Sequence, residues 1–377
     1  MARRLYALVF WVCVFGSLRA HGAFSQVHQN NLPNEAQMLW DEYRNNLLAL
    51  HDYQPGCEPT HVKPKPGTHV QGVIILLHGF TSCPKQFFKM ADHFSNNGFH
   101  VLLPTLPGHG RAGLDELQEQ ESLPGSKNWF IYGSFAHWLN RLAKSFGHEA
   151  VHIGGLCLGG TIASQAMQLD PTLYSRGVLL SPYFEVSKPL LGRLGRWVGR
   201  ASDIINIETQ LSHPIALQDN NICENVERKI YGRAGYCKVR LTNLIAVSRY
   251  AFWIQKNWRG FTNPVQTLLV ENDGVAHLQT TLKMLEGSFD PHETQSHTCV
   301  LNEKVTHSLF SPTDLPLPKP WLPELHTELL DFLAVGVPMQ QSSISGYSWP
   351  RSQNAVSSCQ LFPVERVRQP TISAPIQ

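Results

Sequence analysis

The sequence Gly155-Leu-Cys-Leu-Gly-Gly160 places a nucleophilic side chain between small residues. It follows a short apolar run and precedes a helical pattern, so Cys157 is expected in a tight turn from a strand into a helix. Such a turn strains the backbone at its central residue and requires small residues two positions before and after it, which Gly155 and Gly159 supply. The dipole and free N–H groups of the helix N-terminus favour a thiolate. We therefore predict that Cys157 is a nucleophile; the alternative is a buried structural cysteine.

Two residues further along the chain could activate this cysteine. Asp273 comes directly after another apolar run, and we expect it to orient a base; Glu271 and Asp290 are the alternatives for that role. His307 lies in the loop after the last apolar run and is the expected general base. A nucleophile, a base that accepts its proton and a carboxylate that orients the base form a catalytic triad.

Acyl chemistry also requires hydrogen-bond donors for the negative oxygen that forms on the attacked carbonyl. The backbone N–H of Leu158, next to the nucleophile, is one candidate donor. The second is the N–H of Phe80, within His78-Gly-Phe-Thr81 at the end of the first strong apolar run. His78 itself is expected to fix this loop rather than to act as a base.

The elements that must position these residues are short buried strands that alternate with helices. Runs that are apolar on both faces are typical of buried parallel strands, and they occur at Gly72–Leu77, Phe99–Leu103, Ala150–Gly154, Gly177–Ser181, Val265–Val270 and Thr298–Leu301. Helical patterns occur at Glu35–His51, Pro84–Asn97, Phe135–Gly147, Leu158–Leu169, Ala276–Gly287 and Pro323–Val335. This alternation predicts a doubly wound, mostly parallel α/β sheet, one domain spanning residues 23–335.

Two regions depart from the alternation. Residues from about 185 to 262 separate two strands by more than one crossover requires, and we interpret them as a helical cap over the carboxyl edge of the sheet. Its first helix carries Arg193, Arg196 and Arg200 on one face, a candidate for peripheral contact with an anionic membrane, although a solvated face is the commoner explanation. Residues 336–377, rich in Ser, Pro and Gln, are expected to be a disordered tail.

The N-terminus resembles a secretory signal. Arg3 and Arg4 precede the apolar run Leu5–Leu18, which is short for a membrane span, and small residues follow near Gly22. We expect residues 1–22 to be a signal peptide and the protein to be secreted or periplasmic; the alternative is an uncleaved anchor.

Composition limits the partners. The 31 basic and 29 acidic side chains give the chain a formal net charge of only +2, which argues against nucleic acid as a partner. Without the signal and Cys157, six of the eight cysteines remain. In an oxidising compartment six cysteines permit three disulfides, and Cys223 with Cys237 is the favoured pair.

Residues from about 72 to 333 resemble the α/β-hydrolase superfamily, specifically its carboxylesterase and monoacylglycerol-lipase-like members. The matching motifs are Leu77-His-Gly-Phe-Thr81, Leu103-Pro-Thr-Leu-Pro-Gly-His-Gly110, the Gly155–Gly160 turn, Asp273 and His307. The order nucleophile, acid, histidine also matches. The superfamily usually has serine where Cys157 stands, whereas dienelactone-hydrolase-like members use cysteine. Polyhydroxyalkanoate synthases share only the form of the turn.

This resemblance implies hydrolysis of a carboxylic ester or thioester through an acyl-cysteine, with a hydrophobic, lipid-like acyl substrate. Two alternatives stay open: an acyltransferase that passes the acyl group to an alcohol or amine, and a catalytically impaired binding protein. We expect no cofactor and no metal. His292, His297 and Cys299 lie close in sequence, but no paired-cysteine or HExxH motif accompanies them.

Overall fold

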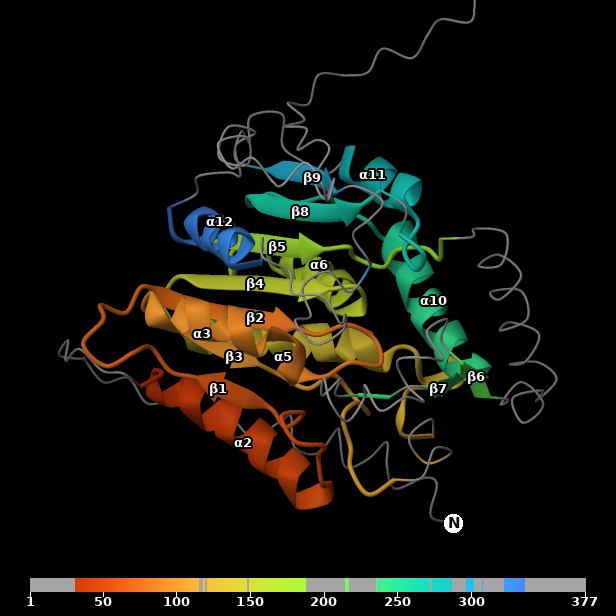
Figure 1. Cartoon of the computed structure of the whole chain (residues 1–377), viewed down its shortest axis with the longest axis horizontal. Coiled ribbons are helices and arrows are strands. Elements are labelled where there is room, and N and C mark those ends of the chain that lie inside the picture. Colours follow the sequence, from red (N-terminus) through yellow and green to blue (C-terminus); the bar gives the residue numbers. More distant parts are fainter. Residues whose placement is uncertain are drawn as a thin grey trace, which may run out of the picture.

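A mixed sheet of seven strands forms the centre of the protein (Figure 1). The computed structural model describes residues 31–114, 118, 121–147, 149–187, 214–216, 235–236, 238–271, 273–286, 296–301, 307 and 322–335. The strands of the sheet, in spatial order, are β1 (Thr60–Val62), β3 (Phe99–Leu103), β2 (Gly72–Leu77), β4 (Val151–Leu156), β5 (Arg176–Leu180), β8 (Val265–Val270) and β9 (His297–Leu301). Only β1 is antiparallel to its neighbour, so the predicted mostly parallel sheet is confirmed.

The strands that were predicted to be buried on both faces are buried. Every residue of β2, β3, β4 and β8 is buried, because helices cover both faces of the sheet. The helices are α2 (Asn34–Leu50), η2 (Pro84–Phe87), α3 (Phe88–Asn96), η3 (Ser126–Asn128), α5 (Ile131–Ser145), α6 (Leu158–Leu169), α10 (Leu241–Lys256), α11 (Leu278–Glu286) and α12 (Leu322–Val335).

Helices pack in pairs on the two faces of the sheet. Helix α5 packs against α6, and α3 packs against α12 on the opposite face (Figure 1). Helix α5 shows why: Tyr132, Phe135, Leu139 and Leu142 recur at helical spacing and are buried. Helix α10 runs past the carboxyl ends of the strands (Figure 1). Because six of the strands are parallel, the loops that follow them meet at this carboxyl edge of the sheet.

Three short strands had no sequence signal. Strand β1 pairs with the edge of the sheet, and β6 (Pro214–Ala216) pairs with β7 (Lys238–Arg240) in a separate two-stranded sheet. Each has only three residues, too few to show a periodic pattern. None of the described helices is both long and apolar enough to cross a membrane. The expected signal peptide, arginine-bearing cap helix and tail lie outside the described residues.

Candidate active site

Cys157 occupies a strained turn between β4 and α6. Its backbone has φ 54° and ψ −119°, a conformation that residues with side chains rarely adopt. The flanking glycines are required by close packing. A Cβ on Gly155 would lie 2.4 Å from the carbonyl carbon of Gly159, and one on Gly159 would lie 2.0 Å from the carbonyl oxygen of Leu77. The predicted need for small residues on both sides of Cys157 is confirmed.

The backbone around Cys157 is anchored to the next strand and to α6. Its N–H donates to the carbonyl oxygen of Leu180 at 2.9 Å, and its own carbonyl accepts from the N–H groups of Thr161 and Tyr183, both at 3.1 Å. The side chain is 6% exposed and is the one free thiol among the described cysteines. Cys157 is thus held rigidly at the carboxyl edge of the sheet, with its thiol unpaired.

Asp273 and His307 meet through a short hydrogen bond. His307 Nδ1 lies 2.6 Å from Oδ2 of Asp273, whose side chain is 3% exposed. The other carboxylate oxygen, Oδ1, accepts the N–H groups of Val275 at 2.7 Å and Ala276 at 2.9 Å. Both oxygens are therefore engaged, which fixes the carboxylate and, through it, the ring of His307. Because Nδ1 faces the carboxylate, Nε2 is the atom available for proton transfer.

The electrostatics of His307 connect it to Cys157. Burial lowers the pKa of His307, but interactions with the adjacent Cys157 and the hydrogen-bonded Asp273 outweigh burial and raise the pKa to about 10. Nε2 is buried and has no hydrogen bond of standard geometry within the described part of the chain. The structure therefore places His307 between a carboxylate on one ring nitrogen and a thiol beside it.

The alternative acid Glu271 does not take this place. Glu271 is exposed, and its backbone N–H donates to the carbonyl oxygen of Leu301 at 2.7 Å. Asp290 lies outside the described residues. Among the described carboxylates, Asp273 alone bonds to His307.

The loop after β2 brings Phe80 to the same edge of the sheet. A Cβ on Gly79 would lie 3.5 Å from Cβ of Cys157, so this loop packs directly against the strained turn. The N–H of Gly79 donates to Oε1 of Gln86 at 2.9 Å. Within the described residues, the N–H groups of Phe80 and Leu158 have no hydrogen-bond acceptor. Both groups therefore remain available to a bound ligand.

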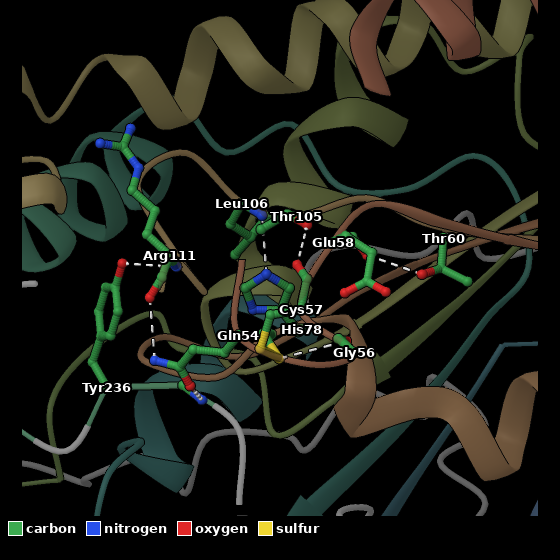
Figure 2. Close-up of a disulfide and its surroundings, with 12 residues drawn as sticks. Gln54, Gly56, Cys57, Glu58, Thr60, His78, Thr105, Leu106, Arg111 and Tyr236 are labelled. Carbon is green, nitrogen blue, oxygen red and sulfur yellow. Dashed lines mark hydrogen bonds between the residues drawn. A yellow bond between two sulfur atoms is a disulfide. The ribbon is translucent and has the colours of Figure 1, made fainter. Parts of the chain in front are cut away.

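His78 holds this loop and cannot act as a base. Its Nδ1–H donates to the carbonyl oxygen of Gly79 at 2.9 Å. Its Nε2 accepts the N–H of Leu106, also at 2.9 Å (Figure 2). Burial, and then the nearby His109, lower its pKa well below the usual range. The ring is thus neutral with both nitrogens occupied, which confirms the structural role expected for His78.

Several residues that shape the site had no signal in the sequence. Gln86 binds the loop from η2, and a disulfide joins Cys57 to Cys83 with Cα atoms 5.0 Å apart. An even number of cysteines permits disulfides but does not show which residues pair. Cys299 is also disulfide-bonded, whereas the favoured pair Cys223–Cys237 lies outside the described residues. No group of three metal-ligating side chains is found among the described residues.

Comparisons with known proteins agree with this architecture. Residues 72–205 match the family described as alpha/beta hydrolase fold. The thermostable monoacylglycerol lipase of Bacillus sp. (strain H-257) is 23% identical over 123 residues, which are 31% of this chain and 42% of that lipase. The chain is thus matched to less than half the length of this relative.

Two solved structures resemble nearly the whole domain. A soluble variant of monoglyceride lipase from Saccharomyces cerevisiae has a TM-score of 0.54 at 14% identity, covering 84% of this chain and 99% of that one. The monoacylglycerol lipase of Paleococcus ferrophilus has a TM-score of 0.50 at 16% identity, covering 74% of this chain and 100% of that one. The protein therefore has the α/β-hydrolase fold, as the sequence predicted. The solved structures that it resembles include monoacylglycerol and monoglyceride lipases.

Proposed function

We propose that this protein hydrolyses carboxylic esters of hydrophobic acyl groups, with Cys157 as nucleophile, His307 as general base and Asp273 as the orienting acid. The observation that carries the proposal is the position of His307, hydrogen-bonded to Asp273 at 2.6 Å and electrostatically coupled to Cys157. A histidine in this position can hold the proton of a thiol while the carboxylate stabilises the resulting imidazolium.

The reaction proceeds in two halves. The proton of Cys157 resides on Nε2 of His307 while the sulfur attacks the ester carbonyl and forms a tetrahedral intermediate. The N–H groups of Phe80 and Leu158 donate to its negative oxygen. When the intermediate collapses, the carbon–oxygen bond to the alcohol breaks, His307 protonates the departing oxygen, and an acyl-cysteine remains. Water then attacks the thioester carbonyl and His307 takes its proton. The carbon–sulfur bond breaks, His307 returns the proton to the sulfur, and the acid leaves with Cys157 regenerated as the free thiol.

An acylglycerol-like ester is the substrate class that the relatives support. The Bacillus relative is a monoacylglycerol lipase, and both structurally similar proteins are monoacylglycerol or monoglyceride lipases. In open α/β sheets, ligands bind outside the carboxyl ends of the strands, and the position of Cys157 at that edge supports this substrate class. Rates of hydrolysis for a series of monoacylglycerols with increasing acyl-chain length would show which chain length is preferred.

The decisive experiment measures turnover of p-nitrophenyl acyl esters and monoacylglycerols by the wild type and by Cys157→Ala. We expect a burst of p-nitrophenol, an acyl group on Cys157 in the intact mass, and loss of about 10⁴-fold in kcat in the variant. Full activity in Cys157→Ala would exclude the proposed nucleophile.

The same assay separates the two alternatives. An acyltransferase would pass most acyl groups to added glycerol or amine, so product analysis that finds only free acid argues against it. A binding protein without catalysis would form no acyl adduct. It would also show no His307-dependent alkylation of Cys157 by iodoacetamide.

We further propose that the protein is exported through the segment 1–22 and works in an oxidising compartment. The disulfide between Cys57 and Cys83 supports this, because structural disulfides are rare in reducing compartments. N-terminal sequencing of the protein from the extracellular or periplasmic fraction tests the idea. A cytoplasmic protein that retains Met1 would contradict it. Peripheral membrane contact through the arginine-bearing cap helix stays a prediction.

A further inference from the structure

The loop that presents Phe80 is held at both ends. At the end of β2, His78 bonds to Leu106 and the N–H of Gly79 bonds to Gln86. At the other end, only three residues beyond Phe80, the disulfide joins Cys83 to Cys57 (Figure 2). We call residues 78–83 the donor loop, because its central N–H is a proposed oxyanion donor.

The segment on the far side of the disulfide is itself fixed. Cys57 is fully buried; its N–H donates to the carbonyl oxygen of Gln54 at 2.8 Å, and its carbonyl accepts the hydroxyl of Thr105 at 2.7 Å (Figure 2). A Cβ on Gly110 would lie 2.7 Å from Cβ of Cys57, so the loop after β3 packs against the disulfide. The disulfide therefore connects the donor loop to a rigid part of the protein.

The donor loop also contains backbone strain. Thr81, directly after Phe80, has φ 65°, which is unfavourable for a β-branched residue. Such a conformation persists only where its surroundings enforce it. The carbonyl of Thr81 accepts the N–H of Tyr236 at 2.7 Å, and Gly235 lies so close that a Cβ there would be 2.0 Å from that carbonyl oxygen. Without a restraint at Cys83, relaxation of Thr81 would rotate the adjoining peptides.

We propose that Cys57 and Cys83 are positioning residues, whose disulfide holds the donor loop so that the Phe80 N–H faces the oxyanion of the acyl intermediate. The inference rests on the proposed function, since it assigns the disulfide a part in the same reaction. Neither sulfur touches the substrate. If the donor loop rotates, substrate binding changes little, because the hydrogen bond from the Phe80 N–H to the oxyanion forms only in the transition state. Loss of that hydrogen bond therefore lowers kcat and leaves KM nearly unchanged.

The test compares the wild type with the double variant Cys57→Ala/Cys83→Ala on one p-nitrophenyl ester, at a temperature where circular dichroism shows both folded. Displacing a donor by about 1 Å costs up to about 100-fold. We expect kcat to fall about 10- to 100-fold and KM to change less than about threefold. Affinity for an alkyl trifluoromethyl ketone, which forms a tetrahedral adduct with Cys157, should fall by the same factor as kcat/KM. An unchanged kcat and ketone affinity would overturn the proposal.

A stability control separates positioning from general loosening. Leu329→Ala removes a fully buried side chain on α12 and is expected to destabilise the fold about as much as the loss of a disulfide does. It should lower the melting temperature while leaving kcat and ketone affinity unchanged. If Leu329→Ala lowers kcat as much as the double variant does, the disulfide has no specific role.

If the double variant does not fold, the bond is opened in the folded wild type with a phosphine in urea below the unfolding transition. Reduction yields two thiols and the phosphine oxide, and peptide mapping then counts the thiols at Cys57 and Cys83. Activity should fall in proportion to the opened bond and return on reoxidation; full activity with the bond open would overturn the proposal. Failure of the proposed function has a different signature: Cys157→Ala would keep the wild-type rate, or the wild type would not turn over any ester.

Discussion

The two halves of the candidate site are built differently. The half with Cys157 and the donor loop depends on contacts between different elements of the fold: the disulfide to Cys57, the bond from Gly79 to Gln86 in η2 and the packing of Gly159 on β2. In the half with Asp273 and His307, the carboxylate itself is held by short-range bonds, because Oδ1 of Asp273 accepts N–H groups only two and three residues further along. One 2.6 Å hydrogen bond then fixes the histidine.

This difference follows from what each half must hold. The proposed oxyanion donors are backbone N–H groups, so the direction of each N–H bond depends on the conformation of the loop that carries it. Contacts with other segments are needed to restrain that conformation. An orienting carboxylate is a side chain, and a local turn is enough to fix its rotamer. Variants that loosen the donor loop should therefore lower kcat gradually as the direction of the Phe80 N–H is lost, whereas variants of Asp273 and His307 should abolish proton transfer.

The largest effect is expected from Asp273→Asn. The amide keeps an acceptor for Val275 and Ala276 but presents Nδ2–H to Nδ1 of His307, which forces the ring into the wrong tautomer. We expect kcat to fall by about 10⁴-fold with little change in stability. The matched control is Glu271→Gln, a neighbouring exposed acid, which should change kcat less than about twofold. Equal losses in the two variants would refute the assignment of Asp273, and with it the local character of this half.

A smaller effect is expected from Gln86→Leu in the other half. This change leaves the buried N–H of Gly79 without an acceptor, at a cost of about 1–3 kcal/mol in stability, and loosens the donor loop. The expected loss in kcat is about 10- to 100-fold. Gln86→Glu keeps an acceptor at Oε1 and should restore most of the activity, as steady-state kinetics on one ester would show. If the Leu and Glu variants behave alike, the bond to Gly79 does not control the donor loop.

The sequence predicted the fold well because the fold depends on short-range pattern. Apolar runs identified all six parallel strands of the sheet, and the glycines around Cys157 revealed the turn, since the packing that excludes a Cβ is reflected in residue type. The order of Asp273 and His307 after their strands followed from the same pattern.

The long-range restraints could not be predicted in this way. Nothing in the residue types around Cys57 and Cys83 shows that these two cysteines pair, because pairing depends on how distant segments come together. The positive φ of Thr81 is equally hidden, since a β-branched residue is the one least expected there. Strand β1 has only three partly buried residues and follows no apolar period.

The last expected effect is on stability, and it tests how His307 joins the two halves. The pKa of His307 is about 10 in the folded protein and 6.5 in its ordinary state, so the folded protein binds the proton more tightly. The resulting stabilisation is fully present below pH 6.5 and is lost as the pH rises through 10. Between these values the free energy of unfolding should fall by up to about 1.4 kcal/mol per pH unit from this group.

Urea unfolding of the wild type and of His307→Gln measures this pH dependence, because the glutamine variant lacks the titrating ring. The difference between the two unfolding free energies should shrink from pH 7 to pH 10. A constant difference across this range would mean that His307 is not held as an imidazolium between Asp273 and Cys157, and that the 2.6 Å bond joins neutral partners.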